Sequence, residues 1–341
     1  MIISYAAQLV LTLMLLIFLK PLSVKLGLVD IPKGRKQHKK HVPLVGGIAV
    51  YLAATITTVI FFPDILLIVH ILLLSGILVG LSIWDDLKEL SVKVRVGMQI
   101  IVIVVLYFIF DIHLESFGNI LYFNINLGLL ALPVMVIAGL GFINAINMID
   151  GLDGLSSGLS IISFSFIGIS TWLFNGQSPV SILCGLLVIS LLVFICFNLS
   201  EHHKVFLGDA GSIFLGFILF SLIIAATQKG DYYAFRPVTA LWFTAVPLMD
   251  TVSVMVRRIK QGNSPFFPDR QHIHHIVQKK LGCKWQTLFG IYMVAIIAGL
   301  YGLLGEYLMI PAYVQFALFL IIFLVYYKLT SHYHKVMDEV V

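Results

Sequence analysis

The residues best suited to chemistry stand between two long apolar runs and read Asn147-Met-Ile-Asp150-Gly151-Leu-Asp153-Gly154. Asn147, Asp150 and Asp153 are three residues apart, so on a helix or its frayed end they share one face. The two glycines let the backbone turn or approach a ligand closely. Carboxylates and an amide suit the hydroxyls of a sugar or ribose and the edge of uracil. The alternative, a capped helix start, accounts for only one of the two Asp residues.

Two further acidic motifs also stand where an apolar run ends or begins. Asp85 and Asp86 are adjacent, so they can share Mg²⁺, or one can bind the metal while the other acts as a base. The alternative for this pair is a solvated helix end. Asp209, in the segment Phe206-Leu-Gly-Asp-Ala-Gly-Ser212, stands at the start of the next apolar run, where it could also be only a cap. Phe206 could stack on a base or anchor at the membrane interface.

A fourth motif is rich in histidine and reads Pro268-Asp-Arg270-Gln-His272-Ile-His274-His275. Three His residues beside an Arg can bind phosphate through charge-assisted hydrogen bonds. A transition metal is the alternative ligand, but the segment has neither a Cys nor a His-Glu pairing to support a zinc centre. An exposed loop that happens to be His-rich is the other alternative. We therefore expect a phosphate-binding segment.

The elements that must position these motifs are membrane-spanning helices. The chain has 341 residues, of which 60% are hydrophobic and only 11% charged, so it is not a soluble protein. The composition predicts an all-α polytopic membrane protein with a single integral-membrane domain over residues 1–341. Spans need roughly 17–25 apolar residues. Eleven such runs occur, at residues 2–20, 44–62, 64–84, 97–113, 126–146, 155–174, 178–197, 210–228, 238–256, 286–306 and 310–328.

The distribution of Lys and Arg predicts the orientation. All of these residues except Lys229 and Arg236 fall in the loops after alternate runs or in the C-terminal tail. This side is therefore expected to be cytoplasmic, with the N-terminus outside and the C-terminus inside. All four motifs and the longest loop, residues 257–285, lie on this side. The net charge of +5 reflects this topology and an attraction to anionic lipid and phosphate, and does not indicate binding to nucleic acid.

Taken in this order on one membrane face, the motifs resemble the bacterial polyprenyl-phosphate N-acetylhexosamine-1-phosphate transferases of the WecA and TagO type, distant relatives of the MraY translocase. The resemblance extends from about residue 25 to about residue 290. Its first cytoplasmic loop is matched by Asp30, Pro32, Arg35, Lys36, His38, Pro43, Gly46 and Gly47. Between Asn198 and Phe206 the chain departs from the family's Pro-containing pattern, which leaves the roles of Asn198 and Lys204 open.

The resemblance implies that a sugar 1-phosphate moves from a UDP-sugar to undecaprenyl phosphate and that UMP leaves. The His-x-His-His segment favours GlcNAc, and the product would start a cell-envelope glycan such as teichoic acid or O-antigen. The implied location is the bacterial cytoplasmic membrane, with the active site facing the cytoplasm. Related enzymes also suggest a homodimer.

The resemblance further implies a role for each motif. Asp209 and Asp86 would bind Mg²⁺, for which Mn²⁺ could substitute, and Asp85 or Asp86 would act as the base if one is needed. The nucleotide would be held by Asn147, Asp150, Asp153 and, stacked on uracil, Phe206. The diphosphate or the sugar would be held by Arg270, His272, His274 and His275. Direct in-line attack by the lipid phosphate is favoured over an aspartyl-phosphate intermediate.

Two other classes of protein compete with this interpretation. A secondary transporter also carries carboxylates within the membrane, but its sites usually lie near the midplane on broken, repeated helices. A phosphotransferase that uses CDP-alcohols would carry an Asp-Gly-x-x-Ala-Arg signature, which this chain lacks.

Overall fold

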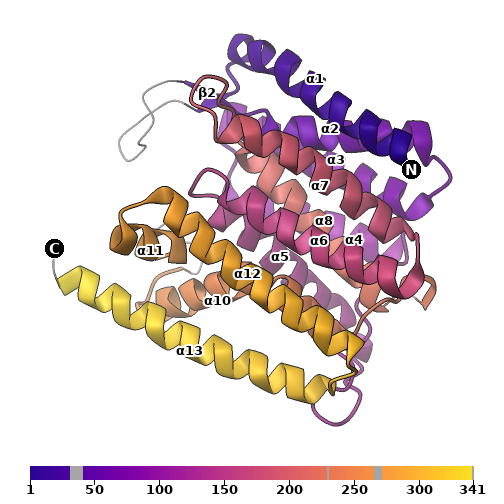
Figure 1. Ribbon diagram of the computed structural model, residues 1–341, viewed down its shortest axis with the longest axis vertical. Coiled ribbons are helices and arrows are strands. Elements are labelled where there is room, and N and C mark those ends of the chain that lie inside the picture. Colours follow the sequence, from indigo (N-terminus) through magenta and orange to yellow (C-terminus); the bar gives the residue numbers. More distant parts are fainter. Residues whose placement is uncertain (31–40, 229, 265–270, 340–341) are drawn as a thin grey trace.

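The structure is a computed structural model that describes residues 1–30, 41–228, 230–264 and 271–339 (Figure 1). Two short strands, β1 (Val29–Asp30) and β2 (Val42–Pro43), pair antiparallel, and two 3-10 turns, η1 (Gly128–Leu130) and η2 (Gly230–Tyr232), precede helices. The helices are α1 (Ile2–Leu26), α2 (Gly46–Phe61), α3 (Leu66–Lys88), α4 (Val92–Phe108), α5 (Ala131–Ile149), α6 (Leu155–Asn175), α7 (Pro179–Asn198), α8 (Gly208–Gln228), α9 (Pro237–Phe243), α10 (Ala245–Lys260), α11 (Ile273–Leu281), α12 (Lys284–Tyr307) and α13 (Ala312–Glu339).

The long apolar helices make this a polytopic membrane protein. Within the described ranges, eight helices are long and apolar enough to cross a membrane, and the bent pair α9–α10 would be a ninth. Each of the eleven expected runs coincides with a helix or with this pair. However, α2 and α4 have only 16 and 17 residues. At about 1.5 Å per residue they are shorter than a hydrocarbon core of about 30 Å. The count of eleven spans therefore stays a prediction, as does the orientation.

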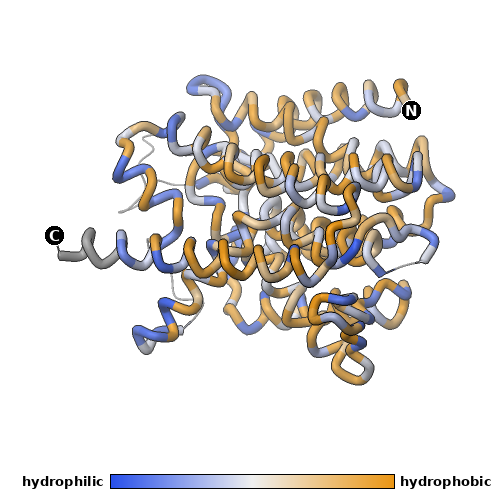
Figure 2. Tube along the Cα trace, turned by 60° about the horizontal axis from the view of Figure 1, so that its bottom comes forward, coloured by the Kyte–Doolittle hydropathy of each residue, from blue (hydrophilic) through white to orange (hydrophobic). Residues whose placement is uncertain are grey.

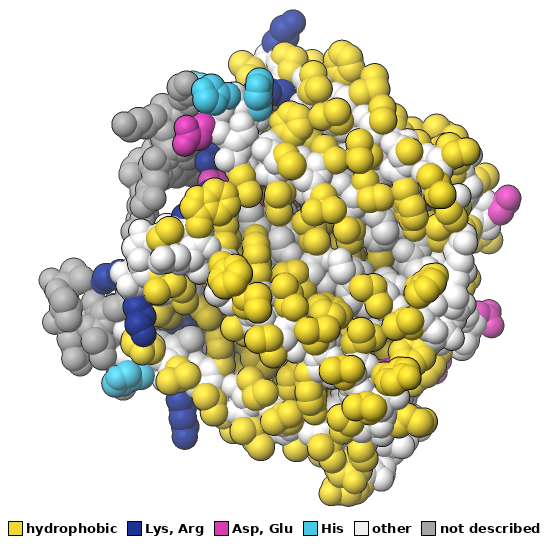
Figure 3. Space-filling model, in the orientation of Figure 1, with side chains coloured by type: hydrophobic (Ala, Val, Ile, Leu, Met, Phe, Trp, Pro, Cys, Tyr) yellow, Lys and Arg dark blue, Asp and Glu magenta, His cyan; other side chains and the backbone are white. Residues whose placement is uncertain are grey.

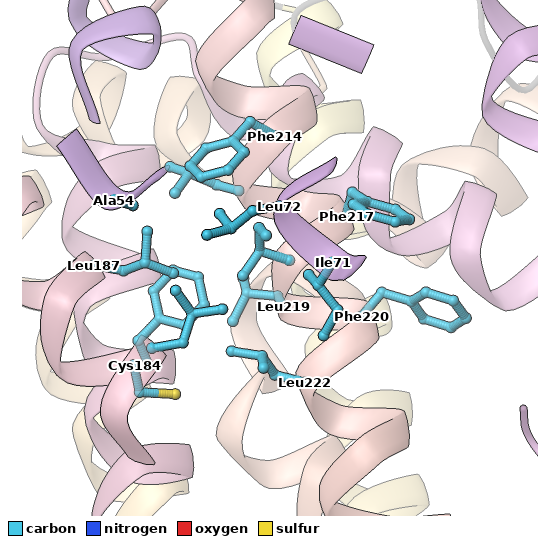
Figure 4. Packing of buried hydrophobic residues seen from close by; sticks show 14 of the residues in the cluster. Ala54, Ile71, Leu72, Cys184, Leu187, Phe214, Phe217, Leu219, Phe220 and Leu222 are labelled. Carbon is cyan, nitrogen blue, oxygen red and sulfur yellow. The ribbon is translucent and has the colours of Figure 1, made fainter. Parts of the chain in front are cut away.

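Helix α8 forms the centre of the molecule, and every residue of its apolar window is buried. Phe214, Phe217 and Leu219 of α8 pack among side chains from α2, α3 and α7 (Figure 4). By contrast, α1 and α13 bury only a minor part of their apolar windows. The outer face is largely hydrophobic (Figure 3), and apolar stretches extend along most helices (Figure 2). Such an outer surface suits contact with lipid.

The expected single span over residues 238–256 is wrong in one respect. It is two helices, α9 and α10, which meet at Thr244 with a bend of 85°. Pro247 in the first turn of α10 does not disturb the new helix, because the amide of that position has no partner inside a helix anyway. After the bend, α10 packs against α5, α12 and α13 (Figure 1). The predicted loop over residues 257–285 also contains a helix, α11.

The starts of α2 and α8 are in backbone-to-backbone contact. The amides of Gly46 and Gly47 donate to the carbonyls of Phe206 and Leu207, at 2.9 and 3.0 Å. A Cβ atom on Gly47 would lie only 2.0 Å from the Cα of Gly211. Neither Gly47 nor Gly211 can be replaced by a larger residue unless the two helices move apart. This contact therefore fixes the start of α8 against the start of α2.

Replacing Gly47 by Ala is expected to lower the free energy of unfolding by about 1–3 kcal/mol, because the added methyl group meets backbone and not a flexible side chain. Thermal unfolding in detergent would measure the change. Gly80→Ala, on α3, is the matched control, since its added methyl has nothing within 4 Å. Equal unfolding temperatures for the two variants would contradict the close contact.

Candidate active site

Asp209 is held at the start of α8 by the contact with α2. Gly208 begins the helix at a φ of +72°, a conformation that glycine adopts without strain. The preceding segment is fixed at both sides, because Phe206 also donates its amide to the carbonyl of Pro43 at 2.9 Å. The carboxylate of Asp209 is thus placed in the first turn of α8, where the helix dipole favours negative charge.

The Asp-Asp pair occupies the last turn of α3, and its two members have different surroundings. Asp85 is buried, and its carboxylate accepts the amide of Leu90 at 2.7 Å and Nη1 of Arg95 at 3.0 Å. The same Nη1 lies 3.9 Å from Oδ2 of Asp209, so Arg95 joins two of the predicted motifs. Asp86 is half-buried, and its Oδ2 has no hydrogen-bond partner among the described residues. Asp86 is therefore the carboxylate of the pair that is available to a ligand.

The end of α5 reaches the same region. Asn147 accepts a hydrogen bond of 2.7 Å from the hydroxyl of Ser212, one turn beyond Asp209 on α8. Asp150 directly follows the last residue of α5. The protein around its carboxylate removes part of its hydration. This desolvation, together with the charges of Asp209 and Asp153, raises the pKa of Asp150 to about 7.

Asp153 lies between two lysines. Its Oδ2 accepts Nζ of Lys204 at 2.8 Å and Nζ of Lys284 at 2.7 Å. Lys204 also lies over the ring of Phe206, 5.1 Å from its centroid, which is a cation–π arrangement. The segment whose role was open in the sequence thus supplies a cation to the predicted nucleotide site. A single Lys in a loop carries no motif, so only the three-dimensional arrangement reveals it.

Asn198 is a second residue that the sequence left open. Its amide oxygen accepts the backbone amide of Gly154 at 2.7 Å, and its nitrogen donates to the carbonyl of Val205 at 2.9 Å. Tyr292 of α12 binds the carbonyl of Gly154 from the other side, at 2.5 Å. Asn198 therefore ties the acidic segment after α5 to the segment before α8.

The histidines of α11 pack onto the acidic segment. The ring of His274 lies against Gly151, where a Cβ atom would be only 2.4 Å from Nε2. Both ring nitrogens of His274 are buried without a hydrogen-bond partner among the described residues. Burial, and then the neighbouring His275, lower the pKa of His274 to about 3, so its ring is neutral at ordinary pH. His272 is buried too, and its Nδ1 lies 2.7 Å from Oδ2 of Asp250.

A cavity of about 380 Å³ lies where these elements meet. Its lining includes Arg95, Asn147, Gly151, Arg258, His272, His274 and His275. A larger cavity, of about 590 Å³, lies beside the opposite end of α8, next to Gln228 and Arg236. None of the four predicted motifs lines that second cavity, so the chemistry assigns the candidate site to the smaller one.

The side chains at this end of the molecule could hold a divalent cation. Among the described residues, no three His, Cys, Asp or Glu side chains are close enough to complete a metal site by themselves. Mg²⁺ needs less than this, because it commonly binds one or two carboxylates and takes its other ligands from water and substrate phosphates. Two observations fit such a site. Oδ2 of Asp86 is buried without a hydrogen-bond partner among the described residues, and the negative charge of Asp209 acts on both Asp86 and Asp150.

The predicted residues thus fall into three groups. The first meets at this end of the molecule: Asp85, Asp86, Asn147, Asp150, Asp153, Phe206, Asp209, His272, His274 and His275. The second belongs to the paired strands and the start of α2: Asp30, Pro43, Gly46 and Gly47. The third lies outside the described residues: Pro32, Arg35, Lys36, His38 and Arg270.

The chain is similar to known proteins over most of its length. A family model described as glycosyl transferase family 4 matches residues 68–227. The undecaprenyl-phosphate alpha-N-acetylglucosaminyl 1-phosphate transferase of Escherichia coli K12 is 39% identical over 323 residues, which cover 92% of this chain and 87% of the relative. The proteins of the same name from Yersinia pestis and Haemophilus influenzae are 38% and 34% identical, over 90% and 93% of this chain and 85% and 90% of their own lengths. The chain therefore belongs to the undecaprenyl-phosphate N-acetylglucosaminyl 1-phosphate transferases of glycosyl transferase family 4.

Proposed function

We propose that this protein transfers GlcNAc 1-phosphate from UDP-GlcNAc to undecaprenyl phosphate and releases UMP. The observation that carries the proposal is the meeting of the four motifs at one end of the bundle. The acidic segment after α5 and the histidines line the cavity, and Arg95, which also lines it, contacts Asp85 and Asp209 of the other two motifs. The names of the relatives support the same reaction. No observation favours a transporter.

The nucleotide of the donor would lie between the acidic segment and Phe206. Asn147 and Asp150 would accept hydrogen bonds from the ribose hydroxyls, and Phe206 would stack on uracil. Asp153 is paired with Lys204 and Lys284, so its part would be to hold these two cations beside the nucleotide. The diphosphate would extend into the cavity, towards Arg258 and the histidines.

Asp86 and Asp209 would hold Mg²⁺, which supplies neutralisation of the negative charge on the diphosphate. Arg95 lies between Asp85 and Asp209, so its guanidinium would also be close to the phosphates of the donor. Both oxygens of Asp85 have partners: Oδ2 accepts from this guanidinium, and Oδ1 accepts the amide of Leu90 just after α3. We therefore assign Asp85 to positioning Arg95, and a role as base is left to Asp86.

The acceptor needs little activation. The second pKa of a phosphate monoester is about 6, so the lipid phosphate is largely dianionic at neutral pH. It would attack the β-phosphorus of UDP-GlcNAc in line, forming the new P–O bond as the bond to the UMP oxygen breaks. The lipid tail would stay outside the helices, against their exposed apolar faces.

The reaction is proposed to take place at the cytoplasmic face of the bacterial inner membrane, with the N-terminus outside and the C-terminus inside. The support is the concentration of Lys and Arg in the C-terminal tail and in the alternate loops of the sequence that also carry the motifs. A homodimer is expected from the family resemblance alone.

Asp209→Asn is expected to reduce turnover by roughly 100- to 1000-fold, because it removes a charged group next to the transferred phosphoryl. The assay incubates purified protein with Mg²⁺, undecaprenyl phosphate and a panel of UDP-sugars, and measures UMP. Asp64→Asn, in an exposed turn between α2 and α3, is the control for removing one carboxylate. Substantial turnover by the folded Asp209 variant would refute its role, and absence of UMP from wild type with every sugar would refute the function.

The KM for UDP-GlcNAc is expected to fall as the pH rises through about 7, because Asp150 then loses its proton and becomes a better acceptor for the ribose. In Asp150→Asn the side chain cannot ionise, so this part of the pH dependence should disappear. Steady-state kinetics over a pH series would measure both proteins. An unchanged profile in the variant would show that Asp150 is not the titrating group.

A further inference from the structure

Asp250 is a fully buried carboxylate at the junction of three helices. It belongs to α10, and its Oδ1 accepts the amide of Ile273 at the start of α11 and the hydroxyl of Tyr326 from α13, both at 2.9 Å. Its Oδ2 faces Nδ1 of His272 at 2.7 Å. Both oxygens are therefore committed, and no part of this carboxylate is left to contact a substrate.

These contacts decide what His272 can do. An ionised carboxylate has no hydrogen to donate, so the hydrogen of this bond must stand on Nδ1 of His272. The other nitrogen, Nε2, is then left without a hydrogen in the neutral ring and is a donor only in the protonated ring. Since His272 also lines the cavity, Nε2 is the polar atom that remains for a ligand there.

The surroundings of His272 suit an anion. Arg258 and Arg95 line the same cavity, while His274 is neutral and stacks on the His272 ring at 5.9 Å between centroids. Two guanidinium groups and an imidazole around one cavity match the charge of a diphosphate.

We propose that Asp250 and Tyr326 are positioning residues for the transfer reaction: they fix the ring of His272 so that, when the ring is protonated, the hydrogen on Nε2 is donated to the diphosphate of the donor. The inference rests on the proposed function for the identity of that ligand. The arrangement follows a general rule, that a ring nitrogen is oriented by the bond its partner nitrogen makes. It also gives α13, at the edge of the bundle, a part in the site.

A double-mutant cycle tests this proposal. Asp250→Asn and His272→Gln are each expected to lower kcat by roughly 10- to 100-fold, the usual effect of removing such a partner. If Asp250 acts through His272, adding Asp250→Asn to His272→Gln should change kcat by no more than about twofold. Losses that multiply in the double variant would overturn the proposal, because a merely structural role predicts independent effects.

The cycle has a matched control and a second variant. Ser253→Ala removes a buried hydroxyl from the same helix, and that hydroxyl has no hydrogen-bond partner among the described residues. It should leave kcat unchanged. If Asp250→Asn does not fold, Tyr326→Phe takes its place in the cycle, since it removes one donor from Asp250 and leaves His272 in contact. Tyr326→Phe should lower kcat less than Asp250→Asn does, and it should have no further effect on kcat in the His272→Gln variant.

Nitrogen NMR of histidine-labelled protein in detergent gives a readout that does not need turnover. The signals of His272, identified by their loss in His272→Gln, should show hydrogen on Nδ1 in wild type and should shift in Asp250→Asn. Addition of UDP-GlcNAc should shift the Nε2 signal. Unchanged spectra in Asp250→Asn would overturn the inference. Wild type that shifts but releases no UMP would refute the transfer reaction alone.

Discussion

The contact between the starts of α2 and α8 is the constraint on which the site depends. Gly47 and Gly211 bring the two backbones together, and Phe206 and Leu207 are hydrogen-bonded to the corner between β2 and α2. Asp209 and the hydroxyl that binds Asn147 are both carried by the residues that directly follow, at the start of α8. If the two helices crossed less closely, the carboxylate of Asp209, the ring of Phe206 and the hydroxyl of Ser212 would all be displaced together.

Charge in the site is balanced locally. Arg95 lies between two carboxylates, and Asp153 lies between two ammonium groups. Burying an ion alone is costly, so such pairs let charged groups stay at the edge of an apolar bundle. Asp86 and Asp150 are the exceptions. One has a buried oxygen without a described partner, and the other has a raised pKa, as expected where a ligand must supply the missing interaction.

Sequence patterns anticipated the convergence of the motifs but not the way they are held. Asp85, Asn147 and Asp209 stand in recognisable runs at the ends of apolar segments, and they do meet. Lys204, Lys284 and Tyr326 are single residues without a motif, and each partner is more than 50 positions away. The break at Thr244 has no signal in the hydropathy, which is continuous over residues 238–256, and only the fold shows that the chain turns there.

The bend between α9 and α10 also decides which charged group reaches the cavity. α10 leaves α9 at 85°, and Arg258, in the basic last turn of α10, lines the cavity together with His272. In the proposed reaction this guanidinium would meet the diphosphate of a water-soluble sugar nucleotide. The isoprenoid chain of the acceptor would meanwhile stay against the apolar outer faces of the helices.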